Sequence, residues 1–288
     1  MMYLLLALSI MLGVLKSAIY NQYAKSEKPG VKSIFRFNAV SYGAAALITL
    51  LFGIGRSLSE ETFICAALYA AAVFSLQALS VAAMIHGSMS LTTVFALYGM
   101  IIPSLAGPIF WKETFGAGQI AGVIIMLISM KMLYEPDKKD APVNKTWSIM
   151  AAICFLLSGT AGLIEKIHQT SNAKDERLMF LFCACMMMFL FSVAGNLAFR
   201  KKAEHAASAK SWLLLGAASG MIVSVYTQIN LTLAGTLDSL IYYPVANGGA
   251  LLLTVFFAVL IFHEKLSKRR LAGFFAGLLA VVLLSIPI

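Results

Sequence analysis

The chain carries little charge for its length. Only 12% of its 288 residues are Asp, Glu, Lys or Arg, while 60% are hydrophobic. Soluble domains contain about 25% charged residues, so this composition excludes a soluble globular protein. The apolar residues form long continuous runs rather than the short alternating segments of a membrane β-barrel. The sequence therefore predicts an all-α integral membrane protein.

Cysteine frameworks and enzyme motifs are also missing. The four cysteines are Cys65, Cys154, Cys183 and Cys185. All lie inside apolar runs without disulfide or metal-ligand spacing, which is typical of small buried side chains. His263-Glu264 begins like a zinc motif, but position 267 is Ser where the second histidine would be required. No phosphate-binding Gly-Lys-Ser/Thr loop is present. We expect no enzymatic activity, no metal and no cofactor.

The net charge of +9 comes from basic residues between the apolar runs, for example at 200–202 and 268–270. Such clusters set membrane orientation and contact anionic lipid headgroups, so we expect no nucleic-acid partner. The first run continues from Met1 to about Tyr20 without a basic n-region or a cleavage site, and predicts a first span rather than a signal peptide. The expected partners are the bilayer of the cell membrane and a small-molecule substrate, with the protein a monomer or a homodimer.

Ten apolar runs are long enough to cross a bilayer, which takes roughly 20 residues. They lie near 2–23, 33–55, 62–85, 90–110, 116–134, 146–167, 177–199, 211–234, 238–262 and 270–287. The longest polar break, 135–145, contains two prolines and mixed charges. It divides the chain into a first five-helix repeat, 1–134, and a second, 146–288, joined by a polar linker.

The two halves are similar to each other in sequence. A shift of 151 positions places Gln77 on Gln228 and Glu113 on Glu264. Because each half has an odd number of spans, the second half enters the membrane upside down. Inverted repeats of this kind recur in secondary transporters, with the binding site between the halves near the bilayer midplane. We therefore expect two inverted five-helix repeats.

The fourth and ninth spans end in related segments, Phe-Trp-Lys-Glu at 110–113 and Phe-His-Glu-Lys at 262–265. Each precedes a helix with a Gly-x-x-x-Gly pattern, at 118–122 and 273–277. The chain resembles the EamA-type branch of the drug/metabolite transporter superfamily in these motifs, in length and in its five-plus-five organisation. The resemblance implies that spans five and ten pack together at the edge of the fold. It also implies export of a small polar metabolite, such as an amino acid, an amine or a sugar derivative, by alternating access.

Other functions stay open at this point. An uptake carrier would have the same fold, and a scaffold or lipid-binding protein would not transport at all. A central polar cavity between the halves would distinguish a carrier from a scaffold. A channel would need a continuous ring of like charges, and the sequence contains none.

Two ionisable residues lie within the predicted spans. Lys16 is deep in the first span, and an intramembrane charge costs about 2.5–3.5 kcal/mol on insertion scales, so such residues usually face the interior. Snorkelling to the headgroups is the alternative. Glu165 is followed at once by Lys166 and His168, and we expect it near the membrane interface. Both are candidates for ion or proton coupling, and Lys16 also for substrate binding. A direct salt bridge between them is not expected.

Spans four and nine contain Gly and Pro at comparable places, which predicts interrupted helices that mark a transporter site. Proline frees a backbone carbonyl, and a cavity, a substrate or a neighbouring helix can satisfy it. Polar side chains on these and neighbouring spans complete the candidate substrate site. They are Gln77, Tyr98, Gln228, Asn230, Tyr243 and Asn247. The alternative is that each glutamine only bonds a neighbouring helix.

Membrane orientation follows from the basic residues. Of the 22 lysines and arginines, most lie in odd-numbered connections, which the positive-inside rule places in the cytoplasm. The exceptions are Lys16, Arg56, Lys112, Lys166, Lys174 and Arg177. Charge therefore predicts both termini outside the cell, whereas the family resemblance implies termini inside.

Overall fold

The computed structural model describes residues 1–27, 31–86, 89–114, 116–133, 144–198, 209–262 and 267–285. Its helices are α1 (Met2–Glu27), α2 (Val31–Gly53), α3 (Glu60–His86), α4 (Met89–Tyr98), α5 (Ile101–Phe110), α6 (Ala117–Leu133), α7 (Lys145–Thr170), η1 (Lys174–Glu176), α8 (Arg177–Ala198), α9 (Ala209–Thr236), α10 (Ser239–Phe262) and α11 (Lys268–Ser285). Of the predicted linker 135–145, only Asn144 and Lys145 lie within the described residues.

The described helices form ten membrane-length segments, because α4 and α5 follow one another across the fourth span. Eight of the segments are long and apolar enough to cross a membrane. The other two are α6, which has 17 residues, and α11, whose first turn holds three basic residues. The prediction of an all-α, multi-pass membrane protein is confirmed.

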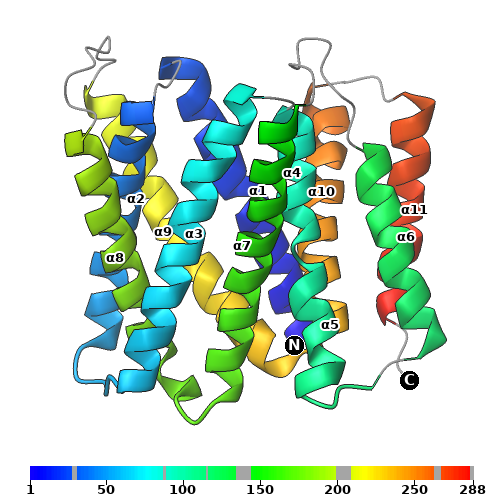
Figure 1. Ribbon diagram of the computed structural model, residues 1–288, viewed down its shortest axis with the longest axis horizontal. Helices are drawn as coiled ribbons and strands as arrows, with labels where there is room; N and C mark the ends of the chain where they lie inside the picture. The colour runs from blue at the N-terminus through cyan, green and yellow to red at the C-terminus, as the bar shows by residue number, and fades with distance from the viewer. Residues whose placement is uncertain are drawn as a thin grey trace.

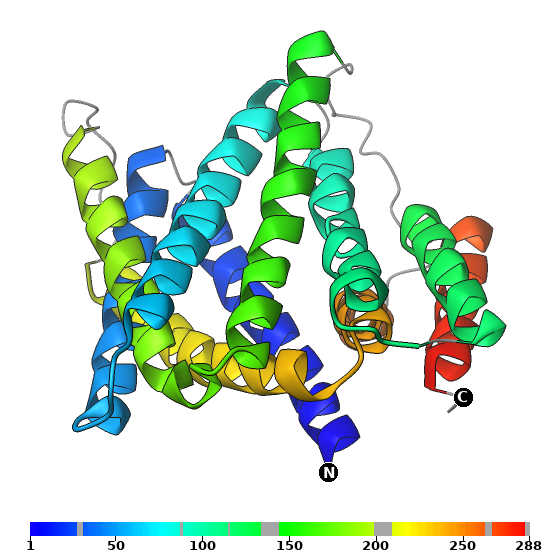
Figure 2. The ribbon, with the colours of Figure 1, turned by 60° about the horizontal axis from the view of Figure 1, so that its bottom comes forward.

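The helices form a flat bundle with α2 and α8 at one edge and α6 and α11 at the other (Figure 1). Between the edges, α1 packs on α9 and α10, while α7 packs on α3, α4 and α5. Figure 2 shows α9 crossing the bundle obliquely and α6 and α11 standing side by side. The start of α1 and the end of α11 lie at the same end as the α2–α3, α5–α6, α7–α8 and α9–α10 connections (Figure 1).

Many small residues lie inside the bundle, and many large apolar ones lie on its surface. Ala45 and Ala66 are fully buried, whereas Leu51 and Leu214 are 69% and 73% exposed. In lipid, large apolar side chains gain nothing by leaving the surface, and small ones let helix backbones approach closely. At 216–220, the glycines pack against α2, with which α9 runs in contact.

Glycines join α6 to α11. A side chain at Gly122 would meet Leu284, and one at Gly277 would meet Leu252 and the Ser129 hydroxyl. That hydroxyl donates a 2.7 Å hydrogen bond to the Gly273 carbonyl. The expectation that spans five and ten pack together at the edge is confirmed. Gly118 takes no part, because a Cβ at this position would have no described atom within 4 Å.

The fourth span is interrupted as predicted, but the ninth is not. Between α4 and α5 the Gly99 carbonyl accepts a 3.0 Å bond from the Ile102 N–H in a tight turn, so it needs no ligand. A side chain at Gly99 would lie 2.6 Å from the Phe155 carbonyl of α7, so α7 packs directly on the break. The predicted interruption of span nine is wrong. α10 runs unbroken from Ser239 to Phe262 with Pro244 inside it, so the loss of one hydrogen bond, to the Leu240 carbonyl, does not break the helix.

Candidate functional site

The chain turns sharply after α5, and this turn places a carboxylate. Lys112 has a positive φ of 54°, and the N–H groups of Trp111 and Glu113 both bond the Gly107 carbonyl. Any side chain at Gly107 would collide with the Glu113 carboxylate. Glycine at 107 therefore lets Glu113 fold back against α5.

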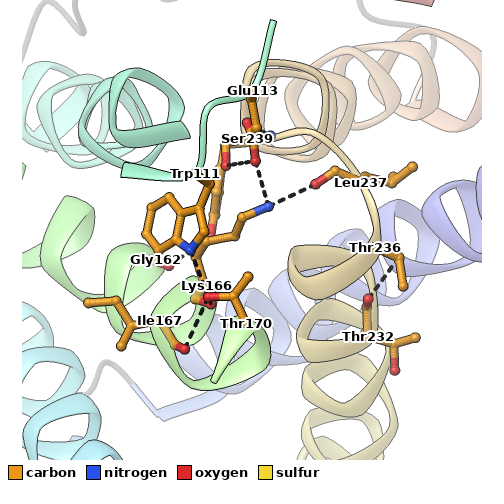
Figure 3. Close-up of polar contacts among 11 residues, drawn as sticks. Trp111, Glu113, Gly162, Lys166, Ile167, Thr170, Thr232, Thr236, Leu237 and Ser239 are labelled. Carbon is orange, nitrogen blue, oxygen red and sulfur yellow. Dashed lines mark hydrogen bonds and ion pairs between the residues drawn. The ribbon is translucent and has the colours of Figure 1, made fainter. Parts of the chain in front are cut away.

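Four residues, Glu113, Lys166, Leu237 and Ser239, form what we call the turn cluster (Figure 3). The Glu113 carboxylate lies 2.8 Å from Lys166 Nζ, and the two side chains are only 8% and 5% exposed. Glu113 also accepts bonds from the Ser239 N–H at 2.7 Å and the Ser239 hydroxyl at 3.1 Å. Lys166 Nζ donates a 3.1 Å bond to the Leu237 carbonyl. Both charges are thus paired and hydrogen-bonded.

The turn cluster satisfies both helix ends at the α9–α10 connection. Glu113 accepts from the first N–H of α10, where the helix dipole favours negative charge, and Lys166 binds a carbonyl just past the end of α9, where it favours positive charge. Trp111 completes the arrangement: its ring lies 5.9 Å from Lys166 Nζ, and its indole N–H donates to the Thr170 hydroxyl at 2.8 Å. The α5–α6 connection, the end of α7 and the α9–α10 connection are therefore joined at one membrane face.

A second set of bonds lies at the same face. Glu176 accepts from the Ser59 N–H at 2.8 Å and from the Ser59 hydroxyl at 2.7 Å, which ties η1 to the start of α3. His168, fully buried in α7, contacts the Thr62 hydroxyl at 3.1 Å through Nε2. The end of α7 is thus fixed on both sides.

The second group of charges lies inside the bundle, and we call Lys16, Tyr69, Glu165 and Tyr226 the interior cluster. Lys16 Nζ lies 5.4 Å from the centre of the Tyr226 ring. The Tyr69 hydroxyl lies next to the Glu165 carboxylate. The charges of Lys16 and Glu165 interact electrostatically, yet among the described residues no salt bridge joins them. The absence of a direct salt bridge agrees with expectation.

Glu165 is buried in the bundle: it is 8% exposed and lies next to Tyr69 of α3. Successive residues of a helix are rotated by about 100°, so Lys166 reaches the turn cluster while Glu165 faces the interior of the bundle. Its expected position near the membrane interface stays a prediction.

Other predicted site residues border the interior cluster. Asn230 accepts a hydrogen bond from the Ser9 hydroxyl of α1 and lies next to the Tyr226 hydroxyl. Tyr243 and its neighbour Tyr242 are buried in α10, and the charge of Glu165 acts on both. The Tyr243 hydroxyl donates a 2.7 Å bond to the Gly162 carbonyl of α7.

The remaining predicted residues have partners on helices. Gln77 bonds the Tyr42 hydroxyl of α2 and accepts a 3.0 Å bond from Asn38. The Gln228 amide donates to the Arg177 carbonyl at the start of α8, at 3.3 Å. The remaining two are Tyr98, which bonds the Leu127 carbonyl of α6, and Asn247, which bonds the Tyr243 carbonyl of its own helix. The glutamines thus bond the second span of their own halves, and their transport role stays a prediction.

Sequence reasoning did not find the turn cluster or Tyr69 and Tyr226. In the sequence Glu113 stands out only as a motif residue, and its partner Lys166 only as a basic residue in a connection. The signal available was Gly107 placed six residues before Glu113, which a folded-back carboxylate requires. Glu264, the predicted counterpart of Glu113, lies outside the described residues.

No protein-family model and no curated protein matches the chain. Its fold is similar to those of solved structures. One, titled only "Crystal structure of protein", has a TM-score of 0.77 over 97% of this chain and 96% of its own, at 11% sequence identity. At that identity the similarity establishes a shared fold, and it carries no information about substrate.

Proposed function

We propose that this protein is a secondary transporter of the EamA type, which exports a small polar metabolite across the cytoplasmic membrane. The observation that carries the proposal is the interior cluster. Lys16 and Glu165 come from the first span of each half and hold charges inside the bundle without neutralising each other in a salt bridge. Intramembrane ionisable groups are costly and mark solute or ion pathways.

The packing supports alternating access between inverted repeats. The first span, α1, lies against the eighth and ninth spans, α9 and α10. The sixth span, α7, lies against the third and fourth spans, α3 and α4–α5. When each span is replaced by the equivalent span of the other half, the contacts of the first span become those of the sixth span. An inverted-repeat carrier requires this correspondence. The contacts α2–α8, α5–α10 and α6–α11 likewise join equivalent spans.

Transport by purified protein in liposomes tests the proposal. Vesicles preloaded with an unlabelled amino acid, amine or sugar mixture should accumulate the corresponding labelled solute by counterflow. The Lys16→Met variant should lose this activity. Lys174→Met, at an exposed position in η1, is the matched control and should retain it. Protein-free vesicles give the background.

Folded protein that moves none of these solutes would overturn the proposal and favour the scaffold. Direction is tested separately, since everted cell-membrane vesicles should take up the substrate of an exporter. Uptake by intact cells alone would identify an importer of the same fold.

A further inference from the structure

The interior cluster contains two opposite charges with incomplete bonding. Among the groups that the structure describes, Lys16 Nζ has no hydrogen-bond acceptor, and its close contact is the face of the Tyr226 ring. An ammonium group carries three donors. The face of an aromatic ring attracts the cation, but it accepts none of those donors in the way a carboxylate does.

Glu165 is incompletely bonded in the same way. Its carboxylate, buried in α7, lies next to the Tyr69 hydroxyl, and no described cation lies within the 4.0 Å of a salt bridge. A carboxylate accepts about four hydrogen bonds. Both charges are therefore short of partners, although each lies within the field of the other.

The walls around the two charges are aromatic and fixed. The Tyr226 ring lies over Gly13 of α1, where a side chain would come within 3.2 Å of it. Asn230 lies next to the Tyr226 hydroxyl, and its hydrogen bond with Ser9 links α9 to α1. The ring next to Lys16 is thus held by groups on two helices, which favours a site built to receive a ligand over a mobile surface lysine.

We propose that Lys16 and Glu165 bind the two ends of one zwitterionic solute, with its carboxylate on Lys16 and its ammonium on Glu165 between the rings of Tyr69 and Tyr226. A ligand with both charges supplies the missing acceptor and the missing donors at once, and it brings no net charge into the bilayer. A free amine or a free acid would satisfy only one end. This inference deepens the proposed transport function, because it names the substrate class of the same cluster.

Ligand-induced thermal stabilisation of the purified protein tests this assignment without transport. The twenty common α-amino acids are screened first, and the one with the largest rise in Tm is compared with its methyl ester and its N-acetyl derivative. The methyl ester keeps only the ammonium and the N-acetyl form only the carboxylate. The intact amino acid should bind about ten- to hundred-fold more tightly than either, because each blocked form loses a charge-assisted contact.

Two variants test which residue binds which end of the solute. Lys16→Met should weaken amino-acid binding about ten- to hundred-fold and leave the methyl ester unaffected. Glu165→Gln should also weaken amino-acid binding about ten- to hundred-fold, but it should leave binding of the N-acetyl form unaffected. Lys174→Met and Glu60→Gln, at exposed positions, are the matched controls. If a variant does not fold, the comparison of the amino acid, its methyl ester and its N-acetyl derivative on the unaltered protein still shows whether both charged ends are bound.

No Tm shift with any amino acid, or equal binding of the blocked forms, would overturn the assignment. A sugar or an amine that binds and is transported would overturn it as well, yet would leave the transporter proposal standing. Zwitterion binding without transport would leave this assignment standing and overturn the transporter proposal.

Discussion

The turn cluster and the interior cluster are built from adjacent residues of one helix, Lys166 and Glu165, but they treat charge in opposite ways. Lys166 has a carboxylate at 2.8 Å and a carbonyl at 3.1 Å. Glu165 lies next to a tyrosine hydroxyl and forms no salt bridge with Lys16. A buried charge that is fully paired belongs to the stability of the fold, whereas one left short of partners is costly unless a ligand completes it. A rotation of about 100° about the helix axis thus separates a structural ion pair from a candidate binding site.

The largest expected effect is loss of stability at the turn cluster. Lys166→Met leaves the Glu113 carboxylate buried without its cation, which costs about 3–5 kcal/mol. The free energy of unfolding in detergent, measured by chemical denaturation, should fall accordingly, while Lys174→Met should leave it unchanged. Equal stability of the two variants would show that the ion pair contributes nothing to the fold.

The next effect tests whether Glu113 and Lys166 act as one unit. Glu113→Gln keeps an acceptor for the Ser239 N–H but removes the charge. Combined with Lys166→Met, it should destabilise the protein less than the sum of the single changes, by about 0.5–3 kcal/mol. A double-mutant cycle in the same denaturation assay measures this coupling. Strict additivity would contradict the pairing.

Lys16→Met should behave oppositely to Lys166→Met. It removes an incompletely bonded charge and keeps length and apolar bulk, so the free energy of unfolding should stay level or rise, by up to about 2.5–3.5 kcal/mol on insertion scales. Binding or transport should be lost at the same time. A variant that is destabilised like Lys166→Met would place Lys16 among the structural charges and end the comparison. One that transports normally would show Lys16 to be a snorkelling residue.

The smallest effect concerns the glutamines. If Gln77 and Gln228 only join helices, Gln→Leu should lower stability by about 0.6 kcal/mol each, the average for such bonds in membranes. Gln77→Leu should cost more, because Gln77 bonds both Tyr42 and Asn38. Transport at normal rates in both variants would support the helix-joining role. Loss of transport without loss of stability would place them in the solute path.

The sequence predicted the features that depend on local pattern. Span positions follow from runs of apolar residues, the break after Tyr98 follows from Gly99 and Pro103, and the contact of α6 with α11 follows from glycines at helical spacing. The unbroken α10 shows the limit of the same rule, since a single proline can stand inside a helix at the loss of one hydrogen bond.

Such local patterns do not predict the turn cluster. It joins Glu113 from the α5–α6 connection, Lys166 from the end of α7 and Ser239 from the start of α10, and nothing local to any one of them identifies the other two. The contact of Glu165 with Tyr69 was not predicted for a related reason. Its neighbours in sequence are polar, but the rotation of the helix and the position of Tyr69 decide which way it faces.

The contact between α6 and α11 also has a consequence for the order of assembly. Ser129 and Gly273, which are hydrogen-bonded in the finished protein, lie 144 residues apart in the chain. At about 5–20 residues per second of synthesis, the ribosome makes α6 roughly 7–30 seconds before the residues that cover it. During that time the Ser129 hydroxyl can bond only its own helix, or water and lipid, and Gly122 lacks Leu284. The first half of the chain is therefore finished only when the last helix has been inserted.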